Sequence, residues 1–222
     1  MRGVTVLAVS AGVVAVMTAA VVLLPGDGAP LTARAALPAA VSPAPGDPLS
    51  DAEIQRAGDI ATSAGPRAHF AAGRAELLYV ERDDGKAGEG ARRAEAYVYD
   101  YGTDTLTVRT VDLGEGKVVR EVSGTGTQPP PSHREETRAA ELLLAHPRLG
   151  EGVRTAYRRA AGKPLVSTAD LWLRGLIYTA RRGACATHRC VRLFVRLPDG
   201  TFLDTSRVVA DLSAKKVQIL EW

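Results

Sequence analysis

The residues with the clearest chemical potential lie in one short segment, Cys185-Ala-Thr-His188-Arg-Cys190. Two thiolates and an imidazole are ligands that zinc and copper accept, so a metal site at Cys185, His188 and Cys190 is one interpretation. A closed site takes a fourth ligand, and the sequence offers none nearby. The favoured interpretation is a disulfide between Cys185 and Cys190, because an exported chain carries its cysteines in an oxidising compartment. Residual metal binding by the three residues stays open.

Other reactive patterns are missing from the sequence. It contains no G-x-S-x-G, no H-E-x-x-H and no P-loop. The glycines of Val122-Ser-Gly-Thr-Gly126 could suggest a phosphate loop, but no helix start with a lysine follows them. We therefore predict no catalytic, cofactor-binding or metal-binding residue, and an enzymatic role is not indicated.

Composition excludes further classes of function. The chain of 222 residues has room for one large domain or two small ones, and its 45% hydrophobic content is typical of globular proteins. The formal net charge of +3 is too small to indicate nucleic-acid binding. Arginine and lysine alternate with acidic residues along most segments, as on solvated faces. We expect no nucleic-acid partner.

The N-terminal segment predicts export. An uncharged apolar run from Val4 to Leu24 has about the length of a membrane-spanning anchor, whereas Ala33-Arg34-Ala35 resembles a signal-peptidase site. A signal peptide and a signal anchor in residues 1–26 are therefore both open, and either places the remaining chain outside the cell. Residues 27–48 are rich in Pro, Ala and Gly, and we expect a disordered linker there. The expected location is extracellular or cell-surface, with membrane contact only through the N-terminal segment.

A first folded domain is expected at residues 49–128. Ser50-Asp-Ala-Glu53 is a capping box, in which the serine hydroxyl and the glutamate carboxylate each satisfy a backbone amide, and it starts a helix ending near Gly65. Strand patterns with period-two alternation and intervening turns follow at 75–81, 94–99, 106–113 and 118–122. The domain is expected to be one helix followed by a four-stranded antiparallel meander.

A second domain is expected at residues 129–222 with the same order of elements. Ser132-His-Arg-Glu135 is another capping box, and its helix stops at His146, before Pro147. A further helix is predicted over 148–161, and strands are predicted at 170–180, 189–197, 202–212 and 216–220. Gly175 inside the first of these strands indicates a bulge or bend.

The ends of the two domains repeat one pattern. Residues 111–119 and 209–217 share an apolar residue, Asp-Leu, a turn, a lysine and a valine. The fold class expected is α+β, as a tandem of two related domains.

The sequence also resembles a known family. Residues 93–100, 111–119 and Gln128-Pro-Pro130 resemble the first of the two small α+β domains that precede the catalytic domain of copper-containing amine oxidases, and residues 207–217 resemble the end of the second. The resemblance covers residues 48–222. It implies that each domain is cystatin-like, with a helix held by a curved antiparallel sheet.

The family's chemistry does not transfer with this resemblance. Copper amine oxidases make topaquinone from the first tyrosine of Asn-Tyr-Asp/Glu-Tyr, whereas Val98 precedes Tyr99-Asp-Tyr101 here and the run alternates like a strand. The four histidines, at 69, 133, 146 and 188, include no H-x-H pair of the kind that holds copper. Copper and quinone therefore belong to the catalytic domain, which is not part of the resemblance. The cystatin inhibitory motif Q-x-V-x-G is also missing.

Two functions follow as hypotheses. The first is an exported, non-catalytic interaction or scaffold module that binds an unidentified protein of the cell envelope. The alternative is an accessory chain that serves a separately encoded copper and quinone amine oxidase in the oxidation of primary amines.

Overall fold

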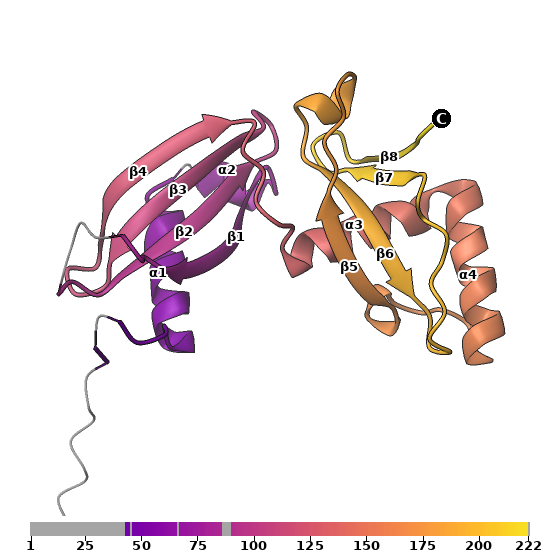
Figure 1. The fold of residues 1–222 in the computed structure, drawn as a ribbon, viewed down its shortest axis with the longest axis horizontal. Helices are drawn as coiled ribbons and strands as arrows, with labels where there is room; N and C mark the ends of the chain where they lie inside the picture. The colour runs from indigo at the N-terminus through magenta and orange to yellow at the C-terminus, as the bar shows by residue number, and fades with distance from the viewer. Residues whose placement is uncertain (1–42, 45, 66, 86–89, 222) are drawn as a thin grey trace, which may run out of the picture. The chain divides into compact units, whose positions relative to one another are not determined.

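The computed structural model describes residues 43–44, 46–65, 67–85 and 90–221, drawn in colour in Figure 1. The predicted leader at 1–26 and most of the linker predicted at 27–48 lie outside these residues. Within the described part of the chain, no helix has the length and apolar character needed to cross a bilayer.

The first half of the described chain carries helices and a four-stranded sheet. Its elements are α1 (Asp51–Ser63), α2 (Arg67–Ala71), β1 (Ala75–Arg82), β2 (Arg93–Asp100), β3 (Thr105–Asp112) and β4 (Lys117–Thr125). The strands are antiparallel in the order β1-β2-β3-β4 (Figure 1). Both hydrogen bonds of the Ser50 capping box are present at the start of α1. The predicted helix and meander are confirmed, and the short α2 was not predicted.

Small side chains let α1 lie close to this sheet. Ala57 and Ala61 on α1 are fully buried with Ala94 and Ala96 of β2. At Gly58 of the same helix, an added Cβ would come within 2.8 Å of the Leu77 side chain. The helix therefore needs small residues on the face that meets the sheet, because larger side chains would push the two layers apart.

The second half has a similar content. Its elements are α3 (His133–Ala145), α4 (Pro147–Ala161), β5 (Trp172–Ile177), β6 (Cys190–Arg196), β7 (Val208–Asp211) and β8 (Lys216–Ile219), with short 3₁₀ turns at Thr168–Asp170 and Ala184–Ala186. The strands form a second antiparallel sheet in the order β5-β6-β7-β8 (Figure 1). The Ser132 capping box is also formed. The structure is thus α+β with two four-stranded antiparallel sheets.

The predicted strand at 202–212 is wrong in length. Only Val208–Asp211 is a strand, and Phe202 makes an isolated bridge to Arg196. Between them, the carboxylate of Asp204 accepts hydrogen bonds from the backbone amide and the hydroxyl of Ser206. This local turn takes the backbone out of the extended conformation, as aspartate and serine often do.

The bulge expected at Gly175 is also wrong. Pairing between β5 and β6 runs without a register shift from Trp172 opposite Arg196 to Ile177 opposite Val191. A Cβ at Gly175 would lie 2.9 Å from Pro131 and 3.0 Å from Val191. No bulge is present, and the glycine permits close packing here.

The second sheet buries one of its faces. Val191, Leu193 and Val195 of β6 are buried in a cluster with Ala140 and Leu143 of α3. Because side chains alternate along a strand, Arg192, Phe194 and Arg196 lie on the opposite face. That face contains exposed Phe194 and Arg196.

Candidate functional site

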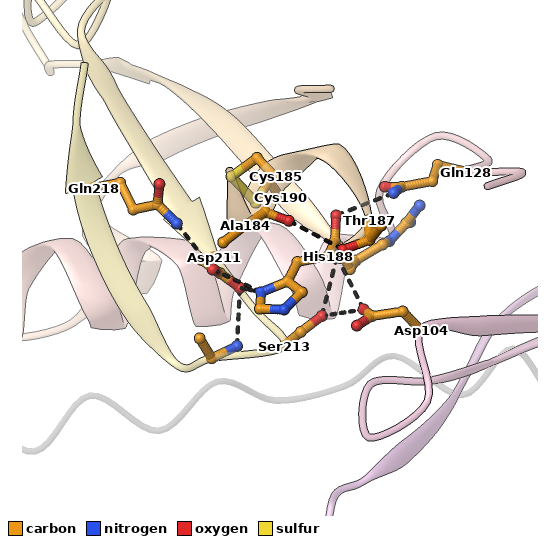
Figure 2. The surroundings of a disulfide bond; sticks show 12 residues. Asp104, Gln128, Ala184, Cys185, Thr187, His188, Cys190, Asp211, Ser213 and Gln218 are labelled. Carbon is orange, nitrogen blue, oxygen red and sulfur yellow. Dashed lines mark hydrogen bonds and ion pairs between the residues drawn. A yellow bond between two sulfur atoms is a disulfide. The ribbon is translucent and has the colours of Figure 1, made fainter. Parts of the chain in front are cut away.

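The predicted disulfide is present at the start of β6. Cys185 and Cys190 are bonded to each other with a sequence separation of 5, and both are buried (Figure 2). Backbone amides of Tyr178 and Ala180 donate to the carbonyls of Cys190 and Cys185. The disulfide and these bonds together fix the connection between β5 and β6.

Beside the disulfide, His188 meets a buried carboxylate. Asp211 at the end of β7 is 0% exposed, and its Oδ2 lies 3.0 Å from Nδ1 of His188 (Figure 2). Gln218 Nε2 donates to Oδ2 at 2.9 Å, and the amide of Ala214 donates to Oδ1 at 2.8 Å. Both carboxylate oxygens therefore have partners, which is what burial of such a group requires.

Ser213 lies near His188 and Asp211 but does not complete a hydrolytic triad. Its Oγ hydrogen-bonds Asp104 and accepts from the amide of Arg189 at 3.0 Å (Figure 2). No hydrogen bond joins Ser213 to His188 in the described part of the chain. A nucleophilic serine needs a base to take its proton, whereas this hydroxyl is directed to the Asp104 carboxylate. The arrangement positions loops and does not activate a nucleophile.

The same neighbourhood brings together three potential metal ligands. The sulfur atoms of Cys185 and Cys190 and a carboxylate oxygen of Asp211 all lie within 4.8 Å of one another. Zinc and copper bind thiolates, and sulfur atoms joined in a disulfide are not thiolates. His188 directs Nδ1 at Asp211, so it pairs with the third potential ligand. In its disulfide form, this cluster does not fit a metal centre.

A buried ion pair lies next to this loop and was not predicted. Arg189 donates from Nε and Nη2 to the two oxygens of Glu135, each at 2.8 Å, and both side chains are 0% exposed. Nη1 donates to the carbonyl of Pro129 at 2.7 Å. The Tyr101 hydroxyl donates to Glu135 at 2.9 Å, and burial, reinforced by the Glu135 charge, raises the pKa of Tyr101. The charges are paired and hydrogen-bonded, as buried ions must be.

The first half contains a matching ion pair. Arg92 donates from Nε and Nη2 to the two oxygens of Glu53 at 2.8 and 2.9 Å, and Nη2 also donates to the carbonyl of Pro48 at 2.7 Å. The hydrogen bond from Arg92, with further bonds from Ser50, lowers the pKa of Glu53 to about 2. The signal available in the sequence was an arginine directly before the second strand of each half.

The tyrosines and histidines that could have served as catalytic or metal-binding residues lie at separate places in the fold. Tyr99 and Asp100 are the last residues of β2, as predicted, whereas Tyr101 lies in the turn that follows. The histidines do not gather: His69 contacts Asp100, His133 contacts Glu136, His146 caps α4 by accepting from the Leu149 amide, and His188 contacts Asp211. Among the described residues, the histidines do not form a group of three potential metal ligands.

Comparison with solved structures shows a likeness in fold. No family model matches the chain, and no curated protein matches it. Among solved structures, a copper-containing benzylamine oxidase from Hansenula polymorpha is similar, with a TM-score of 0.50 and 14% sequence identity. The match covers 80% of this chain and 30% of that chain. The chain is therefore similar in fold to part of a copper amine oxidase, and this likeness concerns the fold alone.

Proposed function

We propose that the chain is an exported, non-catalytic interaction module built from two tandem cystatin-like domains. The observation that carries the proposal is that the polar side chains near the disulfide are already bonded to one another. Both oxygens of Asp211 accept hydrogen bonds, Glu135 is held by a bidentate arginine, and the cysteines are joined. Groups that could act as base, acid or ligand are instead used to hold loops and strands together.

The tandem arrangement is supported by contacts that occur in both halves. Each capping-box glutamate is held by an arginine, Glu53 by Arg92 and Glu135 by Arg189. The carbonyls of these two arginines accept from the amides of Leu113 and Leu212. Corresponding contacts made by corresponding residues favour duplication of one ancestral domain.

The turns that close the two halves add to this support. Asp112 and Asp211 each accept a hydrogen bond from the backbone amide three residues later, Glu115 at 2.9 Å and Ala214 at 2.8 Å. Both aspartates belong to the Asp-Leu-turn-Lys-Val pattern of the sequence. An aspartate at the same place in both turns is expected if the second half is a copy of the first.

Partner capture from the cell envelope tests this function. The full chain, tagged at its C-terminus and produced in its native host, is recovered from envelope extract and the bound proteins are measured by quantitative mass spectrometry. We expect at least one protein whose capture is abolished by excess untagged chain. The absence of any competed protein, or turnover of amines or esters by the purified chain alone, would contradict the proposal.

The second candidate is an accessory chain for an amine oxidase encoded elsewhere. It is favoured by the fold similarity to a copper-containing benzylamine oxidase. This hypothesis predicts that the captured protein contains copper and stains for a quinone. If the captured material contains neither, the accessory role is excluded while the interaction module stands.

A further inference from the structure

The solvent-facing side of the second sheet combines arginines with large apolar side chains. We define the basic aromatic face as Trp172, Arg174, Arg192, Phe194, Arg196 and Phe202. Trp172 is 48% exposed and Phe202 is 59% exposed, whereas most large apolar side chains of a folded domain are buried. Exposed apolar residues grouped on one face indicate an interaction surface.

Pairing within the sheet arranges these residues as a checkerboard. Across β5 and β6, Trp172 is opposite Arg196 and Arg174 is opposite Phe194, and Phe202 flanks Arg196 on its other side. Each arginine is thus bordered by aromatic rings. Alternate residues of a strand lie about 6.6 Å apart, so charged and apolar groups follow one another at that interval along both strands.

The charge of this face has one sign. Residues 171–198 contain six arginines and neither aspartate nor glutamate. In the part of the chain that the structure describes, no carboxylate forms an ion pair with Arg174, Arg192 or Arg196. Nε of Arg192 is buried without a hydrogen-bond partner. Arg196 donates from Nε to the carbonyl of Gly200 at 3.3 Å, so among the described residues these three cations have no anionic partner.

The arginines also cover the faces of aromatic rings. The guanidinium of Arg174 lies 5.5 Å from the centre of the Trp172 ring, and that of Arg192 lies 5.0 Å from the centre of the Tyr178 ring. Trp172 and Phe202 meet edge to face at 6.2 Å. Stacking on nucleic-acid bases needs uncovered ring faces, whereas a guanidinium held by a ring is positioned to bind a carboxylate.

Addition of a strand at the edge of this sheet is disfavoured. β5 is an edge strand, and the amide of Gly175 in its middle donates to Glu136 of α3 at 2.7 Å. A neighbouring chain would have to displace that bond in order to pair with β5. A partner is therefore expected to lie across the face.

We propose that the basic aromatic face binds an extended, acidic segment of a partner protein in which every second residue is alternately acidic and apolar. Every second side chain of such a segment points to the same side at an interval of about 6.6 Å, so its carboxylates can meet the arginines while its apolar side chains pack on Trp172, Phe194 and Phe202. The proposal rests on the proposed function as an interaction module and names the chemistry of its partner.

Fluorescence anisotropy with labelled peptides tests the proposal directly. A peptide with the repeat Glu-Ser-Leu-Ser, called the Glu-Leu peptide, should bind the full chain, and binding should weaken as salt is raised. Peptides in which Lys replaces Glu or Ser replaces Leu should bind at least about tenfold more weakly. Equal binding of all three peptides, no binding of the Glu-Leu peptide, or tighter binding of single-stranded oligothymidylate would overturn the proposal.

Matched variants locate the binding on this face. Replacing Arg174 and Arg196 together by alanine should weaken binding of the Glu-Leu peptide at least about tenfold, and Phe202→Ser should weaken it as well. The control replaces Arg158 and Arg159, two exposed residues of α4, by alanine and so removes the same number of positive charges as the face variant. Equal loss in face and control variants would contradict the assignment. Unchanged circular dichroism spectra would show that all variants fold.

Failure of this proposal can be told apart from failure of the proposed function. Suppose an envelope protein is captured and the variant lacking Arg174 and Arg196 binds it as tightly as the wild type. The basic aromatic face is then not the binding site, whereas the proposed function as an interaction module is supported. If the Glu-Leu peptide binds this face and no envelope protein is captured, the proposed function is contradicted, whereas the preference of the face for acidic and apolar segments is supported.

Discussion

At the scale of single residues, Glu135 is a polar group whose hydrogen bonds hold parts of the fold together. Glu135 accepts a hydrogen bond from the Ser132 amide in the capping box of α3. Its carboxylate also accepts hydrogen bonds from Arg189 and Tyr101. Its two oxygens are therefore fully engaged in a place where no water competes. An acid or base in catalysis must exchange a proton with a substrate, and Glu135 is buried away from any.

Removing the charge of Glu135 should be costly. We expect Glu135→Gln to lower the free energy of unfolding by about 3–5 kcal/mol, because Arg189 is left as a buried cation without its counter-ion. Urea denaturation measures the change. Glu141→Gln, an exposed position on the same helix, should stay within about 0.5 kcal/mol of the wild type. Similar values for both variants would contradict the structural role.

The corresponding residue of the first half predicts a dependence on pH. The pKa of Glu53 falls from 4.5 to about 2 in the folded chain, so the unfolded chain binds this proton first as the solution is acidified. Stability from Glu53 is present above pH 4.5 and is lost as the pH falls towards 2. Free energies of unfolding across this range should decline less in Glu53→Gln than in the wild type. Identical slopes of the free energy of unfolding against pH for the two proteins would contradict the lowered pKa of Glu53.

At the scale of elements, sequence patterns predicted most of the structure for identifiable reasons. Capping boxes at Ser50 and Ser132 are local and need no tertiary information, and α1 and α3 begin where these patterns placed them. The strand predicted over 202–212 failed because apolar spacing does not reveal the Asp204 turn. The arginine pairs were missed because Glu135 and Arg189 are far apart in the sequence and meet only after folding.

Gly175 shows why element packing was harder to predict than element type. Glycine in a strand is compatible with a bulge or with close packing, and the neighbours that decide between them, Pro131 and Glu136, come from another part of the chain. The disulfide could be predicted because both cysteines lie in one short segment. The basic aromatic face could not, since it depends on the register between β5 and β6.

Gly175→Ala should therefore destabilise the second sheet. A methyl group would meet Pro131, Val191 and Glu136 at 2.9 to 3.1 Å, and we expect a loss of roughly 1–3 kcal/mol. Gly152→Ala in α4 is the matched control, because open space surrounds that position and alanine favours helix by up to about 1 kcal/mol. The midpoint of thermal denaturation should fall in Gly175→Ala and rise in Gly152→Ala. A stabilised Gly175→Ala would refute the close packing.

The disulfide predicts a modest contribution to stability. Replacing Cys185 and Cys190 by alanine should cost about 2 kcal/mol, because the bond closes a short loop and removes little entropy from the unfolded chain. Equilibrium unfolding gives the value. Thiol titration of the denatured, unreduced wild type should find none, and two reactive thiols would contradict the bond.

At the scale of the whole described chain, polar contacts tie the two halves to each other. Arg138 of α3 hydrogen-bonds Glu76 of β1, and Asp104 bonds Ser213. Because these bonds involve buried or half-buried groups, we expect both sheets to unfold in a single transition. Tryptophan fluorescence of a Trp222→Phe variant, which keeps Trp172 alone, reports the second sheet, and hydrogen exchange in β2 and β3 reports the first. Separate midpoints for the two probes would contradict this coupling.

The measurement that tests the account most directly compares partner binding in two variants of the full chain. One removes the Ser213 hydroxyl from the polar cluster, as Ser213→Ala, and the other removes two cations of the basic aromatic face, as Arg174→Ala with Arg196→Ala. Quantitative capture of the envelope partner should persist in the first variant and fall at least about tenfold in the second. Loss of capture with Ser213→Ala and retention with the arginine variant would show instead that the polar cluster is the functional site.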